Sequence, residues 1–326
     1  MPTIPKISIT LDKKHDETSF TNNIREYANA LGLSEMINNP LQSEPLAKLT
    51  GNAIKLSNPI SADMEYLRTS LLPGALSVVA RNINRGEKNL SLFEIGNVFN
   101  LKDGKNSIND FDDFKEEEKL IIVLTGNKIE REWFSDTEEY NFYDLKGIIN
   151  TLISKISLDN LLNDTYYSIY NNIYEFYLTK TFKDLEVGLG GKVRSVVLKQ
   201  VDIEQDVYCF EFDLSALKRI PFQEKNYSEP LKYPKVFKDF AFIFDKKVLF
   251  DDVRNFIQVK SSGLLGNVNV FDIFESKELG PNKRSMAFEL EYFDKNRTLT
   301  EEEVEKDFEK LIKLVTKQFS AQLRGN

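Results

Sequence analysis

The stretch "TEEEVEKDFEKLIKLVTKQF", residues 300–319, is the segment of this chain whose structure is marked most clearly in its sequence. Thr300 is a good N-cap, and the three glutamates that follow it lie where the helix dipole favours negative charge. Apolar residues recur at spacings of three and four, which predicts a helix with one buried face. That face consists of Val304, Phe308, Leu311, Ile312, Val315 and Phe319.

The segments before this helix alternate between strand and helix patterns. Strands are indicated at residues 238–244 ("KDFAFIF"), 267–276 ("NVNVFDIFES") and 284–293 ("RSMAFELEYF"), and a helix at residues 249–259 ("LFDDVRNFIQV"). A short last strand in "SAQLRGN" completes the order β-α-β-β-α-β. This order is ferredoxin-like, so we predict a ferredoxin-like domain over residues 233–326.

A second domain is expected because 326 residues exceed the size at which one hydrophobic core usually keeps growing. The stretch "RIPFQEKNYSEPLKYP", residues 219–234, contains three prolines and no periodic face. We interpret residues 221–232 as a linker, which leaves residues 1–220 as the first domain. Its strand patterns alternate between apolar and polar residues and its helices are few, which favours a mostly antiparallel α+β sheet.

Local patterns assign most of this first domain. Helices are expected within residues 19–35, 73–86 and 142–156, and strands within residues 53–61, 89–100, 120–127 and 207–217. The stretch "KDGKNSINDFDDFKEEEK", residues 102–119, is dense in charge and is expected to be a solvated loop.

Composition excludes several classes of function. The chain has 41% apolar and 29% charged residues, as in a soluble globular protein, and no apolar run approaches the roughly 18 residues of a membrane span. The N-terminus also lacks an apolar segment of signal-peptide length, so a cytoplasmic location is expected. Cys209 and His15 are the only residues of their types, which excludes an internal disulfide and a histidine pair for zinc.

Net charge is unevenly distributed along the chain. From Leu231 onward there are 17 basic and 16 acidic residues, so the first 230 residues carry a net charge of −9. A nearly neutral C-terminal part can still present one basic face, because phosphate binding depends on local clustering of charge. The charge distribution therefore permits RNA binding by this part.

A glycine-rich stretch, "GLGGKVR", raises the question of nucleotide binding. Gly188, Gly190 and Arg194 fit G-x-G-x-x-x-R, a spacing with which class II aminoacyl-tRNA synthetases hold ATP. Such a match in isolation is weak, and the alternative is a glycine-containing turn after the strand "LEV". Carboxylates such as Asp112, Asp113 and the run Glu116 to Glu118 are expected to be solvated charge.

Several longer motifs are more specific. They are "NPIS…LRTSLLPGAL…ARNINRG…LFEIGNVF" from Asn58 onward, "FYDLKG", and "YPKVFKDFAFIFD…VFDIFES…KRSMAFELEYFDKNRTLTEEEV". In this order they resemble the C-terminal part of the beta subunit of bacterial phenylalanyl-tRNA synthetase, from about residue 20 to Arg324. The resemblance covers nearly the entire chain.

The resemblance implies a role within a larger enzyme. In that family the phenylalanine-tRNA ligase is a heterotetramer of alpha and beta chains, the alpha chain carries the aminoacylation site, and the beta chain has an inactive catalytic-like domain of class II fold. A ferredoxin-like anticodon-binding domain follows it. The expected partners are the alpha subunit and tRNA(Phe), with no membrane and no DNA.

This resemblance also implies which cofactors to expect. No catalytic residue, metal or cofactor is expected in this chain, and ATP and Mg²⁺ would bind the whole enzyme through other regions. Family beta chains are much longer, so this chain looks like a fragment. Arg194 and Ser195 stand where the family commonly has His and Pro, and Lys238 replaces a usual Arg, which loses the bidentate fork.

Two groups of residues are candidates for binding. Those for the alpha-subunit interface are Arg68, Leu71, Leu72 and Leu76, with the alternative that they fill the core of their own domain. Those for tRNA binding are Lys235, Lys238, Lys283 and Arg284, with the alternative that they are ordinary solvated charge. Two other functions stay open: a free-standing RNA-binding or regulatory module, and an ATP-using ligase working through Arg68, Glu94 and Arg194.

Overall fold

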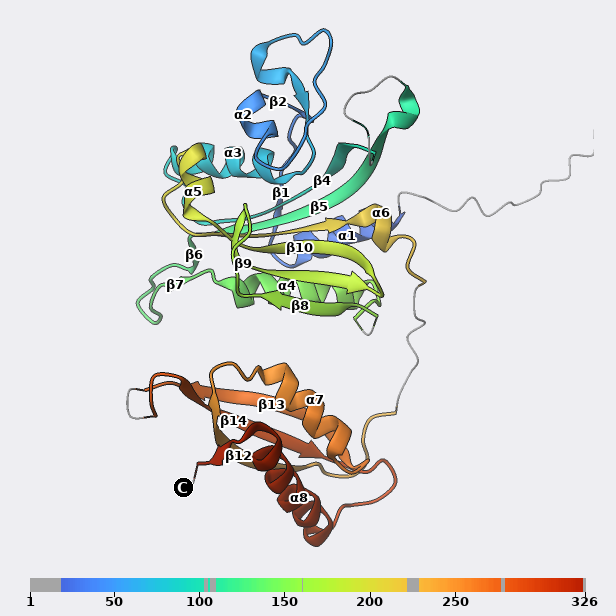
Figure 1. Ribbon diagram of the computed structural model, residues 1–326, viewed down its shortest axis with the longest axis vertical. Helices are drawn as coiled ribbons and strands as arrows, with labels where there is room; N and C mark the ends of the chain where they lie inside the picture. The colour runs from blue at the N-terminus through green and yellow to red at the C-terminus, as the bar shows by residue number, and fades with distance from the viewer. Residues whose placement is uncertain are drawn as a thin grey trace, which may run out of the picture. The chain divides into compact units, whose positions relative to one another are not determined.

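The computed structural model describes residues 19–102, 105, 110–159, 161–221, 229–276 and 279–324. His15 and parts of the predicted linker and of the predicted loop at 102–119 lie outside these residues. The chain divides into two compact units, Met1–Lys225 and Asn226–Asn326, which are described separately below (Figure 1). No helix within the described ranges is both long and apolar enough to cross a membrane.

The first unit is built on a seven-stranded sheet in the order β1-β4-β5-β11-β10-β9-β8. Every pairing in it is antiparallel except β1 with β4, so the architecture is a mixed α+β sheet. The strands are β1 (Ser34–Glu35), β4 (Leu90–Leu101), β5 (Phe114–Thr125), β8 (Asn163–Tyr167), β9 (Tyr174–Phe182), β10 (Leu185–Val193) and β11 (Val207–Asp213).

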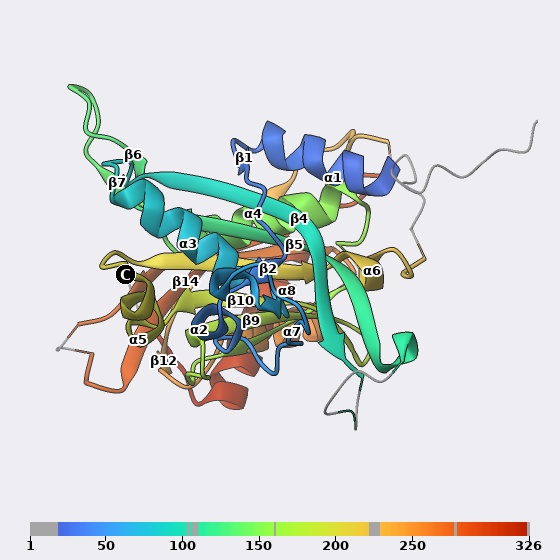
Figure 2. The ribbon, with the colours of Figure 1, turned by 90° about the horizontal axis from the view of Figure 1, so that it is seen from above.

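Helices cover both faces of this sheet. One core cluster joins α1 (Ser19–Ala30), α4 (Phe142–Lys155) and α6 (Leu214–Leu217) to the sheet, and the other joins α3 (Leu72–Ile83) and α5 (Ser195–Leu198) to it. Figure 2 shows α1 and α3 on opposite sides of β4. In β5, Leu120, Ile122 and Leu124 contribute to the first cluster while Ile121 and Val123 contribute to the second. Burial on both faces explains the continuous apolar run in the sequence.

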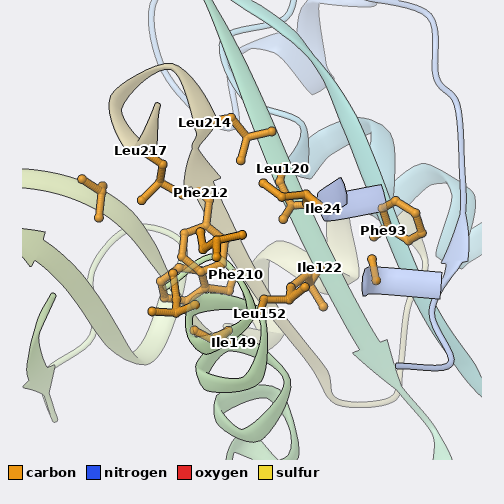
Figure 3. Packing of buried hydrophobic residues seen from close by; sticks show 14 of the residues in the cluster. Ile24, Phe93, Leu120, Ile122, Ile149, Leu152, Phe210, Phe212, Leu214 and Leu217 are labelled. Carbon is orange, nitrogen blue, oxygen red and sulfur yellow. The ribbon is translucent and has the colours of Figure 1, made fainter. Parts of the chain in front are cut away.

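The predicted helices form because their ends are well specified. Asn141 and Asp144 make a capping box at the start of α4, and Ile149 and Leu152 on its buried face pack toward Phe210 and Phe212 (Figure 3). At α1, Gly32 follows the helix with φ +84°, a value that glycine adopts without strain. In α3 the proline lies in the first turn, as predicted from the sequence.

Smaller elements complete this unit. They are β2 (Leu41–Gln42), α2 (Glu44–Ala47), η1 (Ala62–Met64), β3 (Tyr66–Leu67), η2 (Phe111–Asp113), β6 (Asn127–Ile129), β7 (Glu138–Glu139) and η3 (Lys199–Val201). The strand predicted at residues 53–61 is reduced to one isolated bridge between Lys55 and Tyr66. The loop predicted at 102–119 is shorter than expected, because β5 already begins at Phe114.

The glycine-containing turn predicted after "LEV" is wrong. β10 continues as a strand from Leu185 to Val193, through all three glycines. A Cβ on Gly190 would lie 2.2 Å from the carbonyl oxygen of Cys209, and one on Gly191 would lie 2.1 Å from that of Phe176. Glycine is needed here for close contact with the neighbouring strands, not for a turn or a phosphate loop.

The second unit consists of four strands and two helices in the order β-α-β-β-α-β. These are β12 (Val236–Asp245), α7 (Phe250–Lys260), β13 (Leu265–Phe274), β14 (Lys283–Tyr292), α8 (Glu301–Phe319) and β15 (Gln322–Leu323). The strands form an antiparallel sheet in the order β13-β14-β12-β15. Thr300 and Glu303 form the capping box of α8, and Ser320 ends the helix with a left-handed backbone.

One face of this second sheet carries the core. Phe240, Phe242 and Phe244 of β12 pack with Val253 and Ile257 of α7 and with the apolar face of α8. The alternate side chains of β12 and β14 point to the opposite face of the sheet. No helix among the described residues packs against this face, which we call the helix-free face.

Candidate nucleic-acid interface

The helix-free face of the second sheet exposes large apolar side chains. On β13, Phe271 is 60% exposed and Phe274 is 43% exposed, and Phe237 of β12 is 50% exposed. A register shift between Val270 and Asp272 moves the end of β13, so that Phe274 pairs with Ser285 of β14. Exposed aromatic rings on a sheet are platforms on which unpaired bases stack.

A cation lies on the same face. The guanidinium of Arg324 lies 5.3 Å from the ring centroid of Phe274, and its Nη1 donates to Ser285 Oγ at 3.4 Å. The backbone N–H of Arg324 donates to the carbonyl of Ala241 at 2.8 Å, which continues the pairing of β15 with β12. The end of the chain therefore positions a positive charge beside an exposed ring, as in sites that bind a phosphate and a base together.

A hollow of about 460 Å³ adjoins this arginine. β15 pairs only with Phe242 and Ile243, so the earlier part of β12 has a free edge at this point. The lining combines one cation and one carboxylate with apolar side chains: Asp239, Phe240, Ala241, Phe271, Ala287, Phe308, Ile312, Leu323 and Arg324. Arg324, Phe271 and Phe274 are not among the binding candidates predicted from the sequence. Phe271 and Phe274 belong to "VFDIF" in β13, but the register shift after Val270 decides which residues of this stretch face away from the core.

The four basic candidates from the sequence are not gathered on this face. Lys238 pairs with Glu305 of α8 at 2.6 Å, so it lies on the helix side of the sheet, and the bond with Glu305 raises its pKa. Arg284 also lies on the helix side, where it donates to the carbonyl of Val248. Lys235 pairs with Glu291 at 2.6 Å. Lys283 is exposed at the start of β14.

Lys238 and Arg284 therefore do not lie on the helix-free face. The physical reason is the two-residue period of a strand, which turns even-numbered residues of β12 and β14 toward the helices.

The interface candidates of the first unit are interior residues. Leu71, Leu72 and Leu76 are buried in the cluster beneath α3, which corresponds to the alternative that they fill the core of their own domain. Arg68 is 4% exposed and pairs with Glu94 at 2.7 Å. These side chains are therefore not available to a partner in this conformation.

A cavity of about 260 Å³ in the first unit is predominantly acidic. Its lining includes the carboxylates Glu186, Glu211 and Asp213 but only one lysine, Lys119. Burial raises the pKa of Glu186. Burial lowers the pKa of Lys119, but the nearby carboxylates have the opposite effect, with Glu211 contributing most. The net result is that the pKa of Lys119 is raised. Such a lining repels a triphosphate.

The residues proposed for ATP use do not form a site. Arg68 and Glu94 are occupied with each other, whereas Arg194 Nη1 donates to the carbonyl of Asn171 at 3.0 Å and its guanidinium lies over Tyr170. Within the described ranges, no group of three or more His, Cys, Asp or Glu side chains could hold a metal ion. Cys209 is buried, and burial raises the pKa of its thiol to about 12.

Known proteins show clear similarity to this sequence. A profile of the family described as "Phenylalanyl tRNA synthetase beta chain CLM domain" matches residues 1–214, and one described as "Ferredoxin-fold anticodon binding domain" matches residues 232–324. The chain is also similar to two proteins named "Phenylalanine--tRNA ligase beta subunit". The one from Carboxydothermus hydrogenoformans is 29% identical over 99% of this chain and 40% of its own length, and the one from Bacillus subtilis is 31% identical over 93% of this chain and 37% of its own length.

A further beta subunit, from Chlorobium luteolum, is 32% identical over 86% of this chain and 36% of its own length. The chain thus spans about two fifths of the curated relatives that it matches. Among solved structures, pyrrolysyl-tRNA synthetase from Desulfitobacterium hafniense matches 64% of this chain and 70% of its own, with 14% identity and a TM-score of 0.49. The profile match over residues 1–214 shows that this chain belongs to the phenylalanyl-tRNA synthetase beta chain family.

Proposed function

We propose that this chain acts as part of a phenylalanine-tRNA ligase, in which it supports the alpha subunit and binds tRNA(Phe) without catalysing the reaction itself. The shared name of the relatives supports this role over a free-standing RNA-binding module. A cytoplasmic location suits a role in translation.

The first unit serves in this proposal as an inactive core of class II fold. The acidic lining of its cavity and the pairing of Arg68 with Glu94 make these described residues a poor site for the phosphates of ATP. In this proposal ATP and Mg²⁺ bind other regions of the enzyme, and this unit contributes structure.

The second unit serves as a ferredoxin-like anticodon-binding domain. Its element order and its sheet order, in which the first and third strands are central, support this fold. The matched profile carries the same description for residues 232–324.

The contact of Arg324 with Phe274 carries the proposal for RNA binding. Unpaired bases stack on Phe274 and Phe271, and the guanidinium of Arg324 pairs with a phosphate beside them. The two kinds of contact act together: phosphate pairing supplies salt-dependent affinity, and stacking selects single-stranded nucleotides over duplex.

Titration of the chain with tRNA(Phe) at two salt concentrations tests this function. Phe274→Ala should weaken binding by about 5- to 150-fold, the effect of losing about 1–3 kcal/mol of stacking. Arg324→Ala should weaken binding and also flatten its salt dependence. Lys317→Ala removes a charge from the exposed side of α8 and is the matched control, which should bind as the wild type does. Equal affinities of the wild type and all three variants would rule out the helix-free face as the RNA site.

A further inference from the structure

The hairpin between β6 and β7 displays two aromatic side chains at its tip. Trp133 is 93% exposed and Phe134 is 68% exposed, and their rings meet edge to face with centroids 5.3 Å apart. The hairpin projects from the sheet of the first unit in both ribbon views (Figures 1 and 2). Two adjacent large aromatic residues with this exposure are unusual for a surface that stays in water.

The tip is a defined turn. Glu132 N–H donates to the carbonyl of Ser135 at 3.0 Å, and Ser135 N–H donates back at 3.4 Å. Trp133 and Phe134 are thus the two central residues of a two-residue hairpin turn, and neither has a positive φ, so the turn accepts most residue types and requires no aromatic side chain. Local turn preference does not explain aromatic residues here, and neither does packing within the unit.

The base of the hairpin is fixed to the rest of the unit. Lys128 pairs with Asp144 at 2.8 Å, and Asn89 Nδ2 donates to Glu130 Oε1 at 2.7 Å. Tyr140 N–H donates to the carbonyl of Gly126 at 2.9 Å. The rings are therefore held out by an anchored element, which lowers the entropic cost of placing them in a partner's pocket.

Charge around the tip indicates the kind of partner. Residues 128–139 contain five acidic side chains and two basic ones, so the net charge around the two rings is negative. Nucleic acid and anionic membranes would be repelled by it. A protein pocket with an apolar floor and a basic rim is complementary to both features.

We propose that the tip formed by Trp133 and Phe134 inserts into such a pocket on a protein partner, and that this partner is the alpha chain. The identity of the partner rests on the proposed function. Trp is among the residues that contribute most to binding when buried at the centre of an interface, so the tip would be a principal anchor of the complex.

The composition of the chain supplies a specific probe. Trp133 is the only tryptophan in the chain, so incorporation of 5-fluorotryptophan gives a protein with a single fluorine resonance, located at the tip. Addition of the unlabelled alpha chain should shift this resonance as the ring leaves water. The double variant Trp133→Ala, Phe134→Ala should weaken the complex by about 30-fold or more.

Two further variants complete the design. Ile60→Ala alters an apolar side chain that is 90% exposed elsewhere in the unit, and it should leave the affinity unchanged. Glu132→Lys with Asp136→Lys should slow association, because the rim charges would no longer be complementary. The tip lies outside both core clusters, so the variants should keep the circular dichroism spectrum of the wild type.

The outcomes separate this inference from the proposed function. If the alpha chain binds but the resonance stays in place and the double variant binds as tightly as the wild type, the inference is overturned and the proposed function stands. If the wild-type chain forms no complex with the alpha chain, the proposed function fails first. A resonance that moves instead with the concentration of the chain itself, with tRNA or with anionic vesicles would assign the tip to another partner and overturn the inference.

Discussion

Arg68 Nη1 lies 2.7 Å from Glu94 Oε1, with both side chains almost fully removed from water. Two further hydrogen bonds hold the pair: Arg68 Nε donates to the carbonyl of Asn97 at 2.8 Å, and Asn38 Nδ2 donates to Glu94 Oε2 at 2.7 Å. Gly96 makes room for the guanidinium, since a Cβ there would lie 2.2 Å from Arg68 Nη2. The pair therefore joins β4 to the segments around Asn38 and Arg68.

Loss of either partner should destabilise the first unit strongly. Arg68→Ala leaves the Glu94 carboxylate buried without its cation, which should cost about 3–5 kcal/mol of unfolding free energy in urea. The control is Lys115→Ala, which removes an exposed ion pair with Glu117 and should change stability by less than about 1 kcal/mol. Equal effects of the two substitutions would contradict this account of the buried pair.

The glycines of β10 should not tolerate a methyl group. Gly190→Ala places a Cβ against the backbone of Cys209 and should destabilise the chain by about 1–3 kcal/mol or more. Gly147 in α4 has no atom within 4 Å of the corresponding position, so Gly147→Ala should stabilise the helix by up to about 1 kcal/mol. In thermal unfolding, the midpoint temperature should fall for Gly190→Ala and rise for Gly147→Ala. A stable Gly190→Ala protein would mean that the strands can separate without cost.

Acid should weaken the start of α8. The bond with Arg297, and next the backbone of Thr300, hold the pKa of the Glu303 carboxyl at about 2. Since this folded-state pKa lies below the unfolded value of about 4.3, the stabilisation is present above that value and is lost as pH falls toward 2. The urea midpoint of the wild type should exceed that of Glu303→Gln at neutral pH, and the difference should disappear by about pH 2. A difference that does not change with pH would exclude this linkage.

Substitution of Lys283 and of Arg284 by alanine should have different effects, although the two residues are adjacent. Lys283 is exposed, so if it contacts phosphate, Lys283→Ala should reduce the salt slope of tRNA binding by about 0.7 to 0.9. Arg284 is turned toward the helices and donates to the carbonyl of Val248, so Arg284→Ala should lower stability and leave the salt slope unchanged. Salt titrations and urea unfolding of the two single variants distinguish these effects.

Elements with strong local signals were predicted correctly from the sequence. The capping residues and apolar spacing of α8 and α4 act within a few residues, so the sequence alone locates both helices. The continuous run at Leu120 to Leu124 likewise indicated a strand, and burial of this strand on both faces accounts for the run.

Predictions that depended on distant neighbours were less successful. Gly188 to Gly191 resemble a turn in sequence, and only the backbones of Cys209 and Phe176 show why a strand needs glycine there. The strand expected at 53–61 depended on a pairing partner, which the fold supplies at one residue only.

The sequence by itself determined the family, the succession of helices and strands in the second unit, and the lack of histidine and cysteine pairs, because each of these is written in local order and composition. The tertiary structure decided which side chains are available for binding. It turned Lys238 and Arg284 toward helices, placed Leu71 and Leu76 in a core, and brought Arg324 beside Phe274, fifty residues away in the sequence. Exposure and pairing depend on packing between segments distant in the chain, and no local pattern encodes them.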